Sequence, residues 1–463
     1  MQIEKKYYTV KDKETVNLLI EHIDDCELLA IDTETDSLNP RKGKIIGWSL
    51  SGEEGLGFYL PTMEWDPEKE ELKELQIEGK SAHEISKKLL SRLKGKKLIA
   101  HNASFDIRFI DSFYKIDLLD DLWADTAMLV HTVREEGAGM GVFGLKPLAI
   151  SVQEHIGLNV EEAANKEQIE LKESIRKNGG LVTKDNFEIY KADLPIISKY
   201  AAADTDLTLR IYNYFLKILK EEGLEKFFFE EEVMPIYKEV TIPMEKYGVA
   251  LDMELLHKTY EDIKVDLEKN KEIVIKSLIA LPEAKKWVVD TALKTFPVSN
   301  KGTWAQAFAK HRKLPLPTTG KAGRFSITAK TVAGLEDETA RLFLQTGDKK
   351  HLEETEMVKV SLNLWKDSNG GDFINVQSKL QLSEIIFDYM GIKSLTTTDS
   401  GRKQLDMDMV EHLAKKYEWA ENLRVYNKLL KIKSTYIERF IDGAEDGRYY
   451  FYYKQNGTVS GRY

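Results

Sequence analysis

Acidic residues that could share one chemical task occur at three separate places in the sequence. In residues 28–38, LLAIDTETDSL, an apolar run leads directly into Asp32 and Glu34. Asp106 follows a second apolar run in LIAHNASFDIRFI, and Asp204 lies in the helical pattern YAAADTDLTLRIY. The chain contains 77 Asp and Glu residues, so one isolated acidic pair would carry little weight. Three acidic segments attached to three apolar elements therefore form the first candidate site.

Four carboxylates that face one cleft suit hard divalent cations. Mg²⁺ prefers oxygen ligands and usually keeps several waters together with phosphate oxygens of a substrate. Two such ions about 3.5–4 Å apart support in-line displacement at phosphorus. Tyr200 lies four residues before Asp204, on the same face of the expected helix, where its hydroxyl can position a water. Without metal, the four carboxylates would repel one another and some would take up protons.

The segments around these acids alternate between strand and helix patterns. Three strand-type runs, separated by the turn-rich NPRKG and SGEEG, predict a meander near the N-terminus. A helix, a buried strand and a second helix follow. The residues expected in these elements are, in order, 28–35, 44–51, 56–62, 81–95, 96–102 and 104–115. Because the alternation continues to about residue 215, residues 1–215 are expected to form an α/β domain with a mixed sheet and flanking helices.

Helical patterns dominate residues 216–463, which predicts a mainly α region. Within it, residues 296–335 can be aligned without gaps to residues 374–413, and Val298 then stands opposite Val376. The alignment predicts two copies of a helix–loop–helix unit, although one ungapped match of this quality can also arise by chance.

The bulk composition, 42% hydrophobic and 31% charged in 463 residues, is that of an ordinary globular protein. No apolar run approaches a membrane span and the N-terminus has no signal-peptide core, so a cytoplasmic protein without membrane contact is expected. Cys26, the only cysteine, excludes an intramolecular disulfide and a thiolate metal cluster. The net charge of −10 argues against a surface that grips nucleic acid everywhere, but residues 291–335 contain no Asp or Glu. That basic stretch suits local contact with a polyanion, and a solvated loop region is the alternative.

The motifs DTETDSL, NASFD and YAAAD resemble, in order and spacing, the three exonuclease motifs of the DEDD superfamily, in the subgroup with tyrosine in the third motif. The segment DTAMLVHTV…GLKPLA, which begins at Asp125, looks like the corresponding segment in proofreading domains of family A, the bacterial DNA polymerase I type. The resemblance implies an RNase H-like fold and 3′–5′ removal of nucleotides from DNA ends. It also implies two divalent ions, Mg²⁺ or Mn²⁺, as cofactors.

The same resemblance implies a role for each acidic motif residue. Asp32 would bridge the two ions, while Glu34 and Asp204 would complete the site nearer the attacking water. Asp106 would act on the second ion, partly through water. Tyr200 would orient the nucleophilic water. These five residues are the expected catalytic set, and the four carboxylates are the expected metal ligands.

Three further residues near the motifs are candidates for contact with the DNA end. Leu38 and Phe105 would pack against the terminal base or sugar, and membership of the hydrophobic core is the alternative for each. Asn102 would make a polar contact nearby.

The second half resembles the front part of the family A polymerase region. Residues 230–252 look like its start, residues 374–392 and 426–440 like its thumb, and residues 447–463 like the entry to its palm. The basic and hydroxyl side chains of the thumb match suit phosphate contacts without base readout, and an exposed amphipathic helix is the alternative. The expected DNA contacts in this half are Arg424, Lys428, Lys431, Lys433, Ser434, Thr435 and Arg462.

Two features depart from the family pattern. A segment near residues 290–370 has no clear place in the ordinary bacterial thumb and resembles an insertion in phage polymerases. The sequence also stops at Tyr463, inside the palm-entry motif, and has no counterpart of the fingers or of the palm carboxylates. Polymerase activity is therefore not expected from this chain alone, and a truncated chain, an incomplete reading frame or half of a split enzyme is expected.

The sequence thus predicts the proofreading exonuclease domain of a phage-like family A DNA polymerase, residues 1–215, followed by the thumb and the start of the palm, residues 216–463. The expected partners are single-stranded DNA 3′ ends and a primer–template duplex. A complementary polymerase polypeptide and a processivity factor are further candidates. Two alternatives stay open: a stand-alone RNase D-like exonuclease, and a non-catalytic DNA-binding half of a split polymerase.

Overall fold

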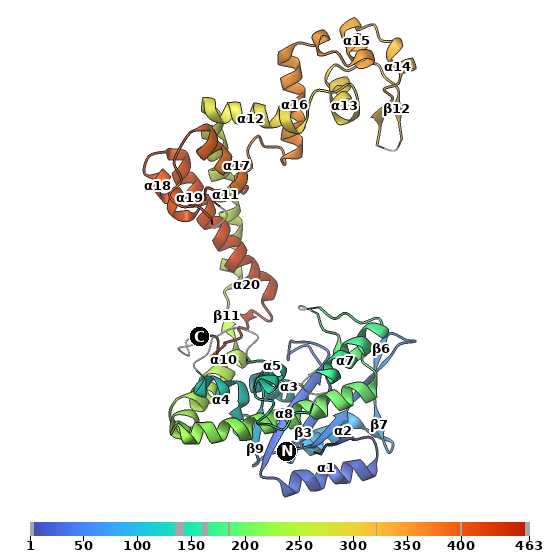
Figure 1. Ribbon diagram of the computed structural model, residues 1–463, viewed down its shortest axis with the longest axis vertical. Helices are drawn as coiled ribbons and strands as arrows, with labels where there is room; N and C mark the ends of the chain where they lie inside the picture. Colours follow the sequence, from blue (N-terminus) through green and yellow to red (C-terminus); the bar gives the residue numbers. More distant parts are fainter. Residues whose placement is uncertain are drawn as a thin grey trace. The chain divides into compact units, whose positions relative to one another are not determined.

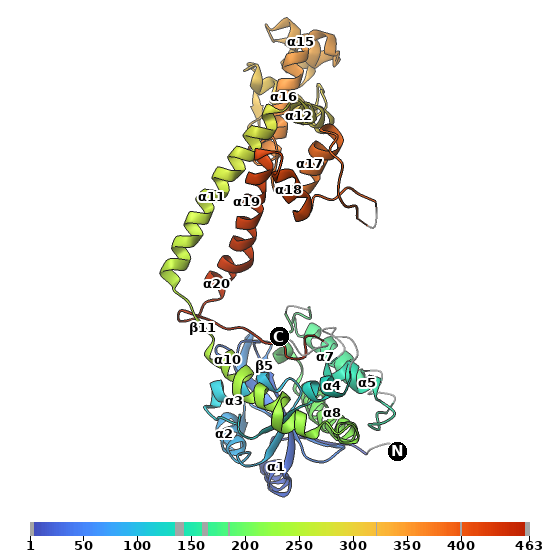
Figure 2. The same cartoon turned by 90° about the vertical axis from the view of Figure 1, so that its left-hand side faces the viewer.

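The computed structural model describes residues 4–134, 143–159, 165–183, 186–320, 322–398 and 401–458. The chain divides into two compact units: the first unit comprises Met1–Val249 and Arg448–Tyr463, and the second unit comprises Ala250–Gly447 (Figures 1 and 2). None of the described helices combines the length and the apolar character that crossing a bilayer requires.

A six-stranded mixed sheet forms the centre of the first unit. Its strands, in spatial order, are β1 (Lys6–Thr9), β4 (Leu56–Pro61), β3 (Ile45–Ser51), β2 (Leu28–Thr35), β9 (Lys97–Ala100) and β10 (Leu122–Asp125). Strands β2, β3 and β4 form the predicted antiparallel meander. Strands β1, β9 and β10 join the sheet by parallel pairing. Strands β2 and β3 lie inside the sheet and are buried along most of their length, so β3 and the first half of β2, up to Ile31, are mainly apolar in sequence.

Helices flank this sheet, and two short hairpins form separate two-stranded sheets (Figure 1). The helices are α1 (Lys13–Asp25), α2 (Ala82–Ser91), α3 (Ala103–Tyr114), α4 (Thr126–Val133), α5 (Leu145–Ser151), α7 (Lys166–Lys177), α8 (Leu194–Glu221), α9 (Val233–Ile236) and α10 (Ile242–Tyr247). The hairpins pair β5 (Met63–Asp66) with β6 (Glu71–Glu74), and β7 (Gln76–Ile77) with β8 (Lys80–Ser81). Residue 215, the predicted domain boundary, lies within α8, and the first compact unit continues to Val249.

The long helix α8 lies directly on the sheet because a glycine allows a close approach. A Cβ atom added at Gly57 of β4 would stand 2.6 Å from the carbonyl oxygen of Ala202 in α8. The buried carboxylate of Asp206 fixes the same helix, since it accepts hydrogen bonds from the Gly55 N–H at 2.8 Å and from the Tyr7 hydroxyl at 2.6 Å. The height and position of α8 over the sheet are therefore set by specific contacts.

The second unit is helical and contains two hydrophobic cores. Helix α11 packs along α19, and with α12, α17 and α18 they enclose the larger core (Figure 2). Helices α13 to α16 and a small hairpin enclose the other core. The helices are α11 (Met253–Ala280), α12 (Pro282–Thr295), α13 (Gly302–His311), α14 (Ala329–Ala333), α15 (Glu338–Thr346), α16 (Glu354–Ser368), α17 (Lys379–Ser383), α18 (Met407–Ala414), α19 (Glu418–Ile432) and α20 (Glu438–Gly443). The hairpin consists of β12 (Thr318–Thr319) and β13 (Arg324–Phe325), and the two-residue strands β11 (Val249–Ala250) and β14 (Arg448–Tyr449) flank the unit in sequence.

Candidate active site

The internal strand β2 presents the first two acidic side chains of the predicted site. Asp32 and Glu34 are two residues apart, so both point to the same face of the sheet. The pairing of β2 with β3 shifts register between Glu34 and Thr35, which marks a bulge at the end of the strand. The apolar residues Leu29 to Ile31 are fully buried in the core. The core therefore anchors the strand immediately before it presents its carboxylates.

Asp106 approaches the same strand from the first turn of α3. Its Oδ1 accepts two hydrogen bonds from Thr33, one from the backbone N–H at 2.8 Å and one from the hydroxyl at 2.6 Å. Thr33 stands between Asp32 and Glu34, so these bonds tie the third carboxylate to the strand that carries the first two. The sequence analysis missed Thr33, and its place between two candidate ligands was the available signal.

Helix α8 supplies Tyr200 and Asp204 from successive turns of one face. The Lys146 ammonium, at the start of α5, forms an ion pair with the Asp204 carboxylate. The same ammonium lies 4.9 Å from the centroid of the Tyr200 ring. Sequence reasoning also missed Lys146, because one lysine among 67 Lys and Arg residues carries no signal before the fold places it.

The four carboxylates, called the acidic cluster from here on, influence one another's protonation. Burial raises the pKa of Asp32 and of Glu34 well above the ordinary range, and the charges of the other cluster members raise both further. Burial also raises the pKa of Asp106 to about 7, against the effect of the Thr33 hydrogen bonds, which favour its ionised form. Lys146 lowers the pKa of Asp32 and Glu34. These effects arise because carboxylates from β2, α3 and α8 lie within electrostatic reach of one another.

The chemistry of the acidic cluster fits a divalent cation. Its members are hard oxygen donors, of which Glu34, Asp106 and Asp204 are buried and Asp32 is half-buried, and the Lys146 ammonium pairs with Asp204. In the described part of the chain, no three His, Cys, Asp or Glu side chains are arranged to hold one ion. Asp106 is hydrogen-bonded to Thr33 and Asp204 is paired with Lys146 in this arrangement. A cation would take over the neutralising role that Lys146 now has.

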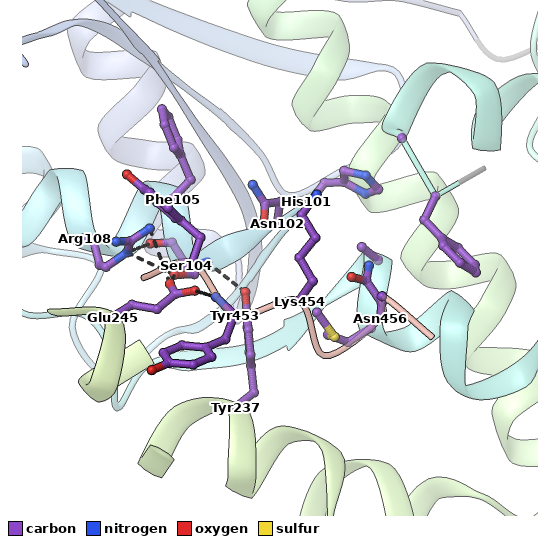
Figure 3. Close-up of a pocket in the computed structure, with 16 residues that line it drawn as sticks. His101, Asn102, Ser104, Phe105, Arg108, Tyr237, Glu245, Tyr453, Lys454 and Asn456 are labelled. Atoms are coloured by element: carbon purple, nitrogen blue, oxygen red, sulfur yellow. Dashed lines mark hydrogen bonds and ion pairs between the residues drawn. The ribbon is translucent and has the colours of Figure 1, made fainter. Parts of the chain in front are cut away.

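A cavity of about 560 Å³ lies against the first turns of α3, and its lining residues do not include the four acids of the cluster (Figure 3). Asn102 and Phe105, both predicted DNA contacts, line it together with residues 452–457 of the chain. Arg108 also lines this cavity and is 6% exposed. Its Nε donates to the Ser104 carbonyl and hydroxyl, both at 3.0 Å, and its Nη2 lies 3.4 Å from Glu245. Its Nη1 is buried and has no hydrogen-bond partner among the described residues, and the Tyr452 ring lies 4.9 Å from the guanidinium carbon.

The three predicted contacts to a DNA end differ in their surroundings. Leu38 is 75% exposed, so it does not belong to the core. Phe105 is half-buried and packs against Phe109, with ring centroids 4.7 Å apart, so it serves the core as well as the cavity. Asn102 is exposed and adopts a left-handed backbone conformation at φ 66°, and its side chain forms no cap for α3. A strained, exposed amide at a cavity is typical of a functional position.

The predicted contacts in the second unit lie on α19 and on the turn Lys433–Ile437 that continues it. Arg424 forms a bidentate pair with Glu421 at 2.6 and 2.8 Å, and Lys433 pairs with Glu438 at 2.5 Å. Ser434 donates to the Leu430 carbonyl, which is a bond within its own helix. Lys428 and Lys431 are exposed, and neither forms an ion pair with the residues that the structure describes. Thr435 is half-buried, and Arg462 lies outside the described residues.

Two protein-family models match the chain. Residues 7–220 match a 3′–5′ exonuclease model, and residues 348–463 match the model of DNA polymerase family A. Residues 221–347 lie outside both matches, including most of the predicted insertion near residues 290–370.

Individual relatives agree with these matches. The chain is 28% identical over 281 residues to DNA polymerase I of Borreliella burgdorferi, a match that covers 59% of this chain and 26% of the relative. It is 23% identical over 454 residues to the DNA polymerase of Escherichia phage T5, covering 94% of this chain and 39% of the relative. The chain thus spans between a quarter and two fifths of the length of these relatives.

A solved structure, described as the POL domain of Pol1 from M. smegmatis in complex with DNA primer-template and dNTP, has a similar fold. Its TM-score is 0.53 at 12% identity, and the match covers 98% of this chain and 53% of that chain. The acidic cluster, the fold and both family matches lead to one assignment. The chain belongs to the family A DNA polymerases and carries their 3′–5′ exonuclease domain followed by part of their polymerase domain.

Proposed function

We propose that this chain removes nucleotides from DNA 3′ ends by metal-dependent hydrolysis. The observation that carries the proposal is the convergence of Asp32, Glu34, Asp106 and Asp204, with Tyr200, from β2, α3 and α8. Burial and the neighbouring carboxylates raise the pKa of Asp32 and of Glu34, which supports a cation near these acids when all are ionised.

Asp32, Glu34, Asp106 and Asp204 would hold two divalent cations, Mg²⁺ or Mn²⁺. When bound, such ions supply an activated water and neutralise charge on the phosphate and on the leaving 3′ oxygen. Burial and the nearby Asp204 raise the pKa of the Tyr200 phenol well above its usual range, so the phenol keeps its proton at neutral pH. Tyr200 can therefore orient the attacking water by a hydrogen bond.

The strand that ends at the acidic cluster would continue into the cavity of Figure 3. Exposed Leu38 and half-buried Phe105 offer apolar surface for the terminal base, and Asn102 offers an amide. Arg108 offers the unpartnered Nη1 to a phosphate oxygen or to the edge of a base. Single-stranded or frayed ends are expected to be preferred, because a paired terminus must first unstack at a cost of a few kcal/mol.

The thumb residues would bind primer–template duplex. Lys428 and Lys431 are the stronger candidates, because they are exposed and form no ion pair with described residues. Arg424 and Lys433 would have to exchange Glu421 and Glu438 for phosphate, which weakens the case for both. The roles of Ser434, Thr435 and Arg462 follow from the family resemblance alone.

The test is release of mononucleotides from a 3′-labelled single-stranded DNA, with Mg²⁺, with Mn²⁺ and with EDTA. Asp32→Ala should abolish the metal-dependent release. Asp36→Ala is the matched control, because Asp36 lies on the same segment and its Oδ1 accepts a hydrogen bond from the Lys44 N–H outside the cluster. Equal release from the parent chain and from Asp32→Ala would refute the assignment of the site.

The same assay decides between DNA and RNA. Matched DNA and RNA oligomers should show faster release from DNA, since the chain belongs to a DNA polymerase family. Faster release from RNA would favour the RNase D-like alternative. Absence of release from folded protein, together with retained duplex binding, would favour a non-catalytic DNA-binding role.

A further inference from the structure

The two aligned segments of the second unit fold into the same series of elements. In residues 296–335, called the first copy, α13 is followed by the β12–β13 hairpin and then by α14. In residues 374–413, called the second copy, α17 and its continuation to Tyr389 are followed by an antiparallel bridge between Thr397 and Lys403 and then by α18. Each copy is therefore a helix–hairpin–helix. The gapless sequence alignment places each element of the first copy opposite its counterpart in the second.

The buried residues of the two copies also correspond at this alignment. Each member of the pairs lies in one of the two cores of the second unit, wholly or partly buried. The pairs are Phe296 with Ile374, Val298 with Val376, Trp304 with Leu382, Phe308 with Ile386, Leu314 with Ile392, Ile327 with Leu405, Val332 with Val410 and Leu335 with Leu413. Agreement at this level of detail argues that the two copies share one packing plan.

Local backbone features repeat as well. The third element of each copy begins with a side-chain cap at the same aligned position, Thr328 for α14 and Asp406 for α18. Gly323 and Gly401 occupy equivalent positions in the hairpins, with φ angles of 59° and 75°. These positive angles favour glycine, which explains why the same residue stands at the same place in both turns.

The copies differ sharply in charge. The first copy has seven Lys and Arg residues and no Asp or Glu, whereas the second copy has four Lys and Arg against six Asp and Glu. Because the second copy builds the same elements with a net negative charge, the fold does not require the positive charge of the first. The excess of cations in the first copy therefore calls for a separate physical reason.

Most of these cations form no ion pair with the residues that the structure describes. Arg312 is the exception, since it pairs with Glu356 at 2.6 Å and with Asp337 at 2.8 Å. The others that the structure describes are exposed and form no ion pair with any described residue. They are Lys301, Lys310, Lys313, Arg324 and Lys330. Four of the five lie at the end of α13, in the hairpin or in the first turn of α14, and so surround the hairpin in sequence.

One of them stands where the backbone disfavours it. Lys313 has a φ angle of 52°, and its aligned partner in the second copy is Gly391 with a φ angle of 71°. A left-handed conformation costs a residue with a Cβ atom free energy that glycine avoids. The second copy thus uses the residue that suits the turn, while the first copy carries a cation at the same place.

We propose that the first copy is a separate duplex-binding module, in which Lys310, Lys313, Arg324 and Lys330 contact backbone phosphates of DNA. The choice of DNA as the polyanion rests on the proposed function, since the chain would already hold a DNA end. Exposed cations that form no ion pair with described residues suit contacts that fix position without reading sequence. The proposal assigns a task to part of residues 221–347, which neither family model matches.

The test is equilibrium binding of the full chain to a blunt DNA duplex. Fluorescence anisotropy gives the binding constant K, without divalent cations, at several salt concentrations. For B-form DNA, the slope of log K against log salt changes by about 0.9 for each phosphate contact. Replacing Lys310, Lys313, Arg324 and Lys330 together by Gln should therefore reduce the slope by about 3–4. Mononucleotide release from single-stranded DNA should stay unchanged in this variant.

A matched control removes the same charge elsewhere. Lys13, Lys87, Lys88 and Lys94 are exposed residues of the first unit without ion pairs among the described residues, and they can be replaced by Gln together. The control should keep the slope of the parent chain. An unchanged slope in the first-copy variant, or an equal change in the control, would overturn the proposal. The exposed cations of the first copy would then be assigned to binding of an acidic protein.

Lys313→Gly separates the binding role from the fold. Since the second copy has glycine at this position, the variant should have an unchanged or higher Tm, together with a slope lower by about 0.9. An unchanged slope would remove Lys313 from the module. Because the assay needs no hydrolysis, a chain that failed to release nucleotides would refute the proposed function without affecting this result.

Discussion

Removal of divalent cations should destabilise the first unit at neutral pH, and acidification should restore its stability. Burial raises the pKa of Asp106 from 3.8 to about 7, so the folded protein binds this proton more tightly than the unfolded chain does. In the metal-free protein, the free energy of unfolding therefore falls as the pH rises from about 4 to about 7. The raised pKa values of Asp32 and Glu34 act in the same direction.

The size of the effect follows from the Asp106 shift. A shift of about 3 pKa units, at about 1.4 kcal/mol for each unit, corresponds to about 4 kcal/mol. Asp106 is 2% exposed, so solvent does little to reduce this figure. For a domain of 150–250 residues, 1 kcal/mol changes the Tm by about 2–4 °C, so the metal-free unit should lose about 8–16 °C.

Differential scanning calorimetry in EDTA, from pH 5 to pH 8, measures this effect on the transition of the first unit. The two units are separate compact bodies, so a single two-state fit to the whole chain is not appropriate. Addition of Mg²⁺ or Mn²⁺ at pH 8 should raise the Tm, because a ligand that binds only the folded state stabilises it.

Asp106→Asn is the decisive variant for this reasoning. The amide oxygen can still accept both hydrogen bonds from Thr33, but the side chain can no longer ionise. The metal-free variant should therefore be more stable than the parent at pH 8, and the difference should be smaller at pH 5, where only about a third of the penalty on Asp106 has developed. A parent chain whose Tm in EDTA does not change with pH, or a variant with the same pH profile, would refute the electrostatic account of the cluster.

Three further predictions concern single residues around the same site. Lys146→Gln removes the ammonium that pairs with Asp204 and would compete with a cation. The metal concentration for half-maximal release of nucleotides should therefore fall. An increase in that concentration would contradict competition between Lys146 and the cation. Arg108→Lys keeps the positive charge near Glu245 but removes the Nη1 donor. In steady-state kinetics, KM for single-stranded DNA should therefore rise by about tenfold while kcat stays unchanged. Tyr200→Phe should lower kcat by about 10²-fold through loss of water orientation, while the rise in Tm caused by Mg²⁺ should persist. A loss of that rise would assign Tyr200 to cation binding instead.

Local sequence patterns predicted much of the fold of the first unit. The meander β2–β4 was predictable because each strand is a short apolar run bounded by turn residues. The acids of β2, α3 and α8 could be singled out because each follows or lies within an apolar segment of the sequence, and their role as one site stays a prediction. The parallel addition of β1 to β4 was not predictable, since a four-residue strand with one exposed and three half-buried residues has no strong pattern of its own.

Residues that act through tertiary contact escaped sequence reasoning. Thr33, Lys146 and Arg108 belong to common residue types, and each gains its role only when β2, α3, α5 and α8 come together. The thumb cations show the opposite case. Arg424 has Glu421 one helical turn before it, so its neutralisation was visible in the sequence as an i,i+3 pair.

The contact between Gly57 and Ala202 gives the acidic cluster an unusual dependence on a residue outside it. Tyr200 and Asp204 belong to α8, and α8 packs this closely on β4 only because residue 57 has no Cβ atom. A single methyl group at this position would act as a spacer between two layers, lifting two members of the site away from the other three. Such a change would impair the proposed nucleotide removal although it alters no charge and none of the four carboxylates.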